Sequence, residues 1–140
     1  METDQASAIE TILSTMRRVA VVGISADPER PSNEVASYLI RQGFTVYGVN
    51  PSLQTVFDAP CYPDLAAVPG PVEVADIFRR SELAGAAVDD AIAIGAKAVW
   101  MQEGVIDEAA AGRARRAGLI VVMDRCMLKE HAARTARETR

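Results

Sequence analysis

The sequence predicts an α/β fold: one domain in which helices cover both faces of a parallel, doubly wound sheet of five strands. Five short, mainly apolar runs are typical of strands buried on both faces; the first and the last are unbroken, and Glu73 and Asp76 are polar exceptions in the third. Helical segments separate these runs, and crossovers of this length join parallel strands in a right-handed sense. With 140 residues, 49% of them hydrophobic, the chain can bury one substantial core.

The first half of the chain predicts a helix at 3–17, a strand at 19–24, a helix at 33–42 and a strand at 44–49. The first helix is predicted from apolar residues at helical spacing, and the first strand from an unbroken apolar run. Ser32 and Asn33 are good N-cap residues for the second helix, and Gly43 supplies its C-terminal stop. Pro51 ends the second strand because proline cannot donate a hydrogen bond to a ladder.

The second half predicts a short helical turn at 64–68, strands at 72–78, 96–101 and 119–123, and helices at 82–95, 107–117 and 128–140. Prolines punctuate the stretch before the third strand and leave room for only one turn of helix there. Asp107 caps the helix that follows the fourth strand, and Gly118 ends it. In the doubly wound class the five strands are expected across the sheet in the order 3-2-1-4-5.

The segment 18–33 is expected to organise the binding site. Such sheets bind ligands beyond the carboxyl ends of their strands, beside the first strand. Gly23 lets the backbone turn tightly or come close to a ligand. The helix N-terminus that follows offers N–H groups and the positive end of a helix dipole, which suit a phosphate. An ordinary turn without a ligand is the alternative at this point.

Composition excludes several classes of partner. The net charge of −4 and the pI near 5.0 argue against a general nucleic-acid binder, whose surface would be basic. No apolar run approaches the ~20 residues needed to cross a bilayer, so no membrane association is expected. The first residues are acidic and polar, without the apolar core of a signal peptide, which favours a cytoplasmic location. Cys61 and Cys126 are too few for a disulfide scaffold and are expected as reduced thiols.

Several familiar cofactor motifs are missing. A dinucleotide site would show G-x-G-x-x-G after the first strand and an acidic residue at the end of the second. Here only Gly23 of that triplet is present, and the second strand ends in Asn50-Pro51, so NAD is disfavoured. A G-x-x-x-x-G-K-[ST] phosphate loop is absent, which removes support for NTP hydrolysis. One serine, Ser25, is thin support for the Ser/Thr-rich loop of an FMN site.

The residues that remain suit anion binding rather than catalysis. Arg30 lies in the first loop, and Arg79 and Arg80 leave the third strand; guanidinium groups suit phosphate oxygens, although one of this pair is expected in solvent. His131 has no evident nucleophile or metal partner, so no catalytic or metal-binding residue is predicted. Cys126 follows the fifth strand on the ligand-binding edge, where a packed small side chain is preferred over a reactive thiol.

Six strings in the chain carry a family resemblance: V-A-V-V-G-I-S-A-D-P-E-R-P-S-N, V-Y-G-V-N-P, C-Y-P-D-L, D-I-F-R-R, A-K-A-V-W-M-Q-E-G and V-M-D-R-C. Together, and in this order, they resemble the small bacterial CoA-binding proteins. Those proteins are single Rossmann-like domains similar to the CoA-binding domain of the succinyl-CoA synthetase alpha subunit. The resemblance covers roughly residues 12–131, so residues 1–140 are expected to form one such domain.

The resemblance implies that coenzyme A or an acyl-CoA binds at the carboxyl edge of the sheet. Carried over by position, the implied ligand contacts are Gly23, Ile24, Ser25, Arg30, Pro31, Ser32, Asn50, Pro51, Phe78, Arg79, Met101, Gln102 and Glu103. The acidic Glu103 has no evident role against an anion. Ligase activity is not implied, because the synthetase subunit carries its phosphorylated histidine in a second domain and His131 does not correspond to it.

The sequence therefore predicts a non-catalytic domain that binds CoA as a binding module, carrier or sensor. Two alternatives stay open: a small NAD(P)-binding oxidoreductase, and a Rossmann-like interaction domain without a ligand. The sequence points to no protein partner and does not choose the acyl group.

Overall fold

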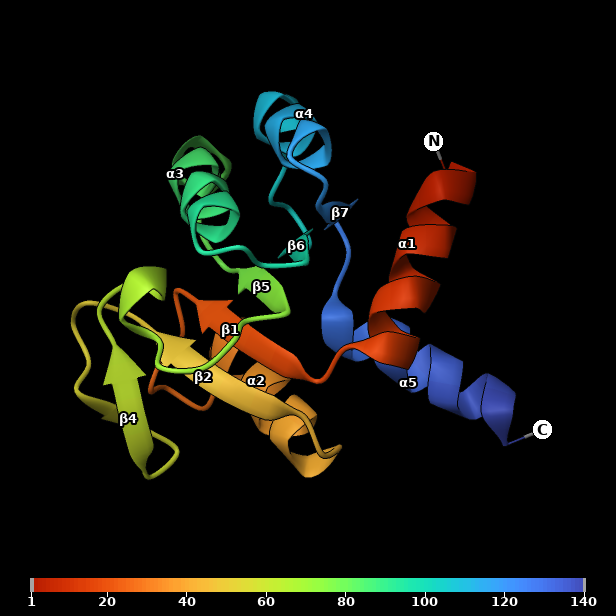
Figure 1. Cartoon of the computed structure of the whole chain (residues 1–140). Helices are drawn as coiled ribbons and strands as arrows, with labels where there is room; N and C mark the ends of the chain where they lie inside the picture. Colours follow the sequence, from red (N-terminus) through yellow and green to blue (C-terminus); the bar gives the residue numbers. More distant parts are fainter. Residues whose placement is uncertain (1, 140) are drawn as a thin grey trace.

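The computed structural model describes residues 2–139. The strands are β1 (Arg18–Val22), β2 (Thr45–Val49), β3 (Thr55–Val56), β4 (Ala59–Tyr62), β5 (Val74–Ile77), β6 (Ala98–Met101) and β7 (Ile120–Val122). The helices are α1 (Glu2–Thr15), α2 (Pro31–Arg41), α3 (Ser81–Ala93), α4 (Glu108–Arg116) and α5 (Met127–Glu138), with a 3-10 turn at Leu65–Ala67. Within this part of the chain, the strands form one sheet in the order β3-β4-β2-β1-β5-β6-β7 (Figure 1). The predicted α/β fold class is confirmed.

The sheet contains two strands that the sequence pattern did not predict, and they change the expected order. β4 pairs in parallel with β2, opposite the side of β2 that pairs with β1. The predicted third strand, 72–78, contains β5, which lies on the other side of β1 from β2. Its expected place beside β2 is taken by β4, so the order 3-2-1-4-5 holds only when β4 is counted as the third strand. β4 was missed because it is short, carries Pro60, and has no apolar run to mark it.

β3 and β4 form an antiparallel hairpin with a two-residue turn. Phe57 and Asp58 occupy this turn with positive φ angles of 54° and 58°. Two consecutive left-handed residues define the hairpin turn whose twist matches that of the flanking strands. A sequence reading would look for Asn-Gly or Asp-Gly at such a turn, so Phe-Asp gives little signal.

Two apolar layers sandwich the sheet. On one face, α1, α2 and α5 pack over the strands, and Leu39 and Met127 are buried there with Val21 and Trp100. On the other face, α3 and α4 approach the sheet through small side chains, namely Ala84, Ala87, Ala91, Ala110, Ala111 and Ala114. Burial of these two layers is the main stabilising term of the fold. None of the helices formed by residues 2–139 is long and apolar enough to span a bilayer.

The helix starts agree only in part with the expected caps. Asp107 caps α4 as predicted, since its Oδ1 accepts a hydrogen bond from the Ala110 N–H at 3.0 Å. The predicted N-caps of α2 are wrong: Arg30 is the N-cap residue, and Pro31 occupies the first helical position. Proline is well suited to that position because its missing N–H would have no helical partner. Ser32 lies inside the first turn of the helix, where its side chain accepts a hydrogen bond from the loop after β1.

Candidate functional site

A cleft of about 760 Å³ opens at the carboxyl edge of the sheet, where β1, β2, β5 and β6 end. This volume is in the range of small-molecule sites. Most of the predicted contacts line it: Gly23, Ile24, Ser25, Arg30, Pro31, Ser32, Asn50, Phe78, Arg79, Gln102 and Glu103. Two predicted contacts do not line it: Met101 is fully buried within the sheet, and Pro51 is exposed in the turn after β2.

The cleft also has lining residues outside the predicted set: Ala26, Glu34, Val35, Leu53, Arg80, Gly104, Val105, Cys126 and Lys129. Their strand ends place Arg80 and Cys126 at this edge, where the sequence predicts solvent for one arginine of the pair Arg79 and Arg80, and a packed side chain for Cys126. Lys129 was missed, because nothing in the sequence shows that the first turn of α5 stands beside the start of α2. The two helices contact one another and lie on the same face of the sheet (Figure 1).

Gly23 makes the turn at the end of β1, and the fold itself requires a glycine there. Its φ is +89°, and a Cβ at this position would collide with the carbonyl group of Phe78. Its N–H donates to the Val49 carbonyl at 2.8 Å, which ties the ends of β1 and β2 together. The Arg79 Cδ would lie 3.6 Å from such a Cβ, so this side chain begins beside the turn. Gly23 and Arg79 are thus neighbours at the cleft.

Polar side chains hold the two loops of the cleft in place. The Ser32 Oγ accepts from the Ser25 N–H at 3.0 Å, and the Asn33 Nδ2 donates to the Ser25 carbonyl at 2.9 Å. The Asn50 Nδ2 donates to the Ile24 carbonyl at 2.7 Å, which joins the loop after β2 to the loop after β1. Ser32 and Asn33 are buried, and their hydrogen bonds fix the position of Ser25 at the cleft. A binding site whose supporting residues are fixed in this way is preorganised.

The N-terminus of α2 and three arginines make one wall of the cleft basic. Arg30, the N-cap residue, makes no side-chain capping hydrogen bond, because a guanidinium group has no acceptor for the N–H groups at the positive end of the helix. Arg79 and Arg80 line the cleft from the end of β5. The Arg80 side chain is 76% exposed and lies 3.4 Å from Glu82, which is the solvent-directed position expected for one of the pair.

The start of α5 also lines the cleft. Cys126 is its N-cap residue, and the Gln102 Oε1 accepts from the Met127 N–H at 3.2 Å. Gln102 therefore supports the helix start rather than facing the cleft with a free amide oxygen. The Lys129 Nζ donates to both carboxylate oxygens of Glu103, at 3.0 and 3.1 Å, and this hydrogen bond raises the pKa of Lys129. Glu103, which lacked an evident role in the sequence, is the partner of Lys129.

Asp76 is buried in β5, two residues before Phe78. Its register neighbours are Val21 in β1 and Trp100 in β6. Neither carboxyl oxygen has a hydrogen-bond partner among residues 2–139, and burial raises the pKa of this group well above its ordinary value. The sequence marked Asp76 only as a polar exception in an apolar strand.

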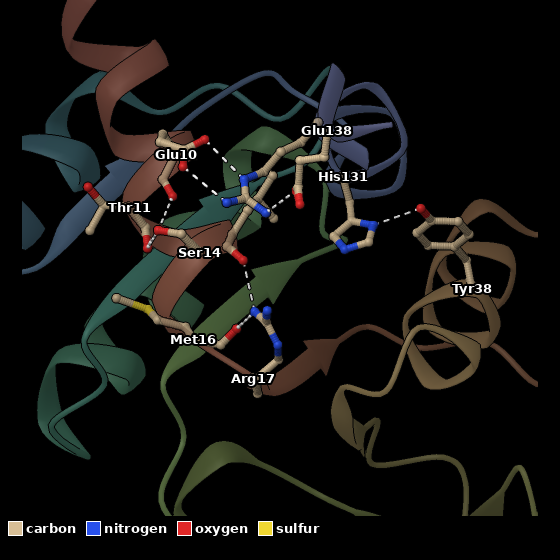
Figure 2. Close-up of polar contacts among 10 residues, drawn as sticks. Glu10, Thr11, Ser14, Met16, Arg17, Tyr38, His131 and Glu138 are labelled. Carbon is tan, nitrogen blue, oxygen red and sulfur yellow. Dashed lines mark hydrogen bonds and ion pairs between the residues drawn. The ribbon is translucent and has the colours of Figure 1, made fainter. Parts of the chain in front are cut away.

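His131 is not among the residues that line the cleft. It lies where α5 meets α2, with its imidazole directed at Tyr38 (Figure 2). Its Nδ1 is 2.7 Å from the Tyr38 Oη, a contact that joins α5 to α2. The Phe44 ring packs edge to face against the imidazole, with the two ring centroids 5.4 Å apart. His131 is 9% exposed, and this burial lowers the pKa of its imidazole, with the charges of Arg17 and Arg134 acting in the same direction.

Ligand-binding domains of the Rossmann-like class hold nucleotides at this edge of the sheet, and the cleft has that position and a basic wall. Within that class the match is specific: residues 17–132 fit the CoA binding domain model, and the chain belongs to the CoA binding domain family. The family resemblance inferred from the six strings is confirmed.

The similar proteins cover most of this chain. The chain is 30% identical over 132 residues to uncharacterized protein YneT of Bacillus subtilis, a match to 94% of this chain and 98% of that protein. A solved structure, a hypothetical protein from Pyrococcus horikoshii, is 40% identical with a TM-score of 0.87, covering 91% of this chain and 89% of that one.

One similar protein is an enzyme. A 72-residue stretch is 33% identical to the ADP-forming acetate–CoA ligase I of Archaeoglobus fulgidus, covering 51% of this chain but 10% of the ligase. The match therefore concerns one part of a much longer enzyme.

Proposed function

We propose that this chain binds coenzyme A or an acyl-CoA in the cleft at the carboxyl edge of the sheet, as a non-catalytic binding, carrier or sensor domain. The observation that carries the proposal is the basic wall of that cleft in a chain of the CoA binding domain family. CoA carries a diphosphate and a 3′-phosphate, so its recognition needs cations and oriented N–H groups. The cleft offers arginine side chains and the positive end of α2, at the place where this fold class binds nucleotides.

The parts of the cleft suit different parts of the ligand. The glycine turn, the N-terminus of α2 and the guanidinium groups of Arg30 and Arg79 suit the phosphates. Asn50 and Leu53, at the end of β2, border the nucleotide. Phe78 gives the floor an apolar surface on which the pantetheine arm can lie. The cytoplasmic location stays a prediction from the sequence.

Ligation is not part of the proposal. The stretch shared with the acetate–CoA ligase is 10% of that enzyme. His131 is held between Tyr38 and Phe44, and its contacts there are structural. The proposal therefore assigns recognition of CoA and no chemical step.

Calorimetric titration with CoA, NADH, FMN and ATP tests the proposal. We expect CoA to bind and NADH not to bind, because β2 ends in Asn50-Pro51 and offers no carboxylate to the ribose diol of a dinucleotide. Tighter binding of NADH than of CoA would favour the NAD(P)-dependent oxidoreductase instead. Absence of binding by all four ligands would favour an interaction domain.

A further inference from the structure

An ion pair at the cleft joins Lys129, which the sequence does not predict there, to Glu103. Lys129 lies in the first turn of α5, and Glu103 lies in the loop after β6. The Lys129 Nζ is 3.0 Å from the Glu103 Oε1 and 3.1 Å from its Oε2. Both residues line the cleft, and their side chains are 65% and 55% exposed. The pair is therefore accessible to a ligand in the cleft.

The charges around this pair favour an incoming anion. The first-turn position puts the Lys129 ammonium beside the positive end of α5. The cleft adds two further cations, Arg30 and Arg79. Against these cations stand Glu34 and Glu103, and both carboxylates attract Lys129 in the ligand-free protein. A phosphate at the start of α2 is thus within the electrostatic reach of Lys129.

We propose that Lys129 binds a phosphate group of the ligand, and that Lys129 is paired with Glu103 until the ligand binds. This inference rests on the proposed function, because it needs a phosphate-bearing ligand in the cleft. Glu103 then competes with the phosphate for one ammonium group. It lowers the affinity of the protein for CoA rather than raising it, which gives the acidic residue a role in an anion site.

The exchange is energetically accessible. Exposed ion pairs are weak, because water screens the charges and two flexible side chains lose freedom when they pair. A phosphate offers more negative charge and more acceptor oxygens than a carboxylate. The ammonium group is a point charge on a flexible stem, so it can turn from one oxygen partner to another.

The experiment is a set of CoA titrations at low ionic strength with four variants. Lys129→Gln should weaken CoA binding about tenfold, the loss expected when one charge-assisted hydrogen bond is removed. Glu103→Gln should strengthen binding by up to about fivefold, since it frees the lysine. In the double variant Glu103→Gln/Lys129→Gln, the gain should disappear and the affinity should equal that of Lys129→Gln.

Lys97→Gln is the matched control. Lys97 also pairs with a glutamate, Glu73, at 3.8 Å, and its side chain is 66% exposed. It precedes β6, at the amino edge of the sheet, so the same change of charge is made away from the cleft. This variant should bind CoA as the wild type does.

Each outcome decides the inference. A loss in Lys129→Gln no larger than in Lys97→Gln would overturn it, because the contact would then be absent or a general effect of net charge. A gain from Glu103→Gln that persists in the double variant would also overturn it, since the glutamate would act through its field alone. Failure of the wild type to bind CoA would overturn this inference together with the proposed function, whereas wild-type binding that Lys129→Gln leaves unchanged would overturn this inference alone.

Discussion

Asp76 places a carboxyl group in the apolar layer between the sheet and the helices α1, α2 and α5. It lies beside Val21 and Trp100, which are buried in that layer. A buried polar group without a partner is costly, and a buried charge costs more still. The raised pKa follows from this cost, because keeping the proton avoids burying a charge.

Replacement of Asp76 by an apolar residue should therefore stabilise the fold. We expect Asp76→Val to raise the free energy of unfolding at neutral pH by about 1 to 3 kcal/mol. A pKa raised in the folded state gives stability that is fully present below the unfolded pKa and is lost as the pH rises through the folded pKa. The advantage of the variant should therefore grow between pH 4 and pH 8, as measured by urea denaturation of both proteins. A constant difference across this range would show that Asp76 does not titrate differently in the folded state.

Individual residues of the site show where sequence reasoning reaches its limit. The strand-end rule found Gly23, Arg79 and Phe78, because each lies at or next to the end of an apolar run that can be seen in the sequence. Ser32 was read as a cap and Asn50 as a nucleotide contact, yet their side chains hold the loops together. Those hydrogen bonds join residues 7 and 26 positions apart, and a pairing across loops has no local signature.

At the scale of elements, the long periodic segments were predictable and the short ones were not. The helices and the five apolar strands agree with the structure to within a few residues at their ends. β4 pairs with β2 through backbone hydrogen bonds, which any residue except proline can donate, so its side chains need no strand pattern. The tertiary position of a neighbouring strand thus created an element that local preference did not predict.

Helices α2 and α5 are joined by the contact between Tyr38 and His131 (Figure 2). The charged groups that act on the imidazole are Arg17, between α1 and β1, and Arg134 and Glu138 on α5. Burial and the two arginines lower its pKa, and Glu138 opposes them. A neutral imidazole is therefore part of this helix contact.

Acid should weaken the contact between α2 and α5. A pKa lowered in the folded state gives stability that is present above the unfolded value of about 6.5 and is lost as the pH falls through the folded pKa. His131→Phe keeps an aromatic ring and cannot titrate, but it leaves the Tyr38 hydroxyl without its partner. In urea denaturation at pH 7.5, the free energy of unfolding of the wild type should exceed that of this variant by about 0.5 to 1.5 kcal/mol. At pH 5.0 the difference should be smaller. A difference that widens toward pH 5.0 would contradict the prediction.

The whole molecule couples ligand binding to its stability. The cleft is built from loops that follow β1, β2, β5 and β6 and from the starts of α2 and α5. These elements come from the beginning, middle and end of the chain, and they meet only in the folded state (Figure 1). A ligand that binds there binds the native state alone, so it must raise the free energy of unfolding.

The rise in melting temperature that CoA causes should differ between variants of Arg79 and Arg80, the two arginines that follow β5. CoA at 100 times its Kd should stabilise the protein by about 2.7 kcal/mol, which raises the melting temperature by roughly 10 °C for a chain of this length. Arg79 begins beside the Gly23 turn, so Arg79→Ala should weaken CoA about tenfold and halve that shift at the same CoA concentration. Arg80 is mostly exposed and pairs with Glu82, so Arg80→Ala should keep about three quarters of the shift or more.

Scanning calorimetry with and without CoA measures both variants against the wild type. The ligand-free melting temperatures separate a loss of folding from a loss of binding, because a damaged fold lowers them and a lost phosphate contact does not. Added salt should reduce the wild-type shift more than the Arg79→Ala shift, since screening weakens a contact that the variant no longer makes. Equal losses in Arg79→Ala and Arg80→Ala would show that both guanidinium groups reach the phosphates. Full shifts in both variants would leave the α2 N-terminus, Arg30 and Lys129 as the anion-binding groups of the cleft.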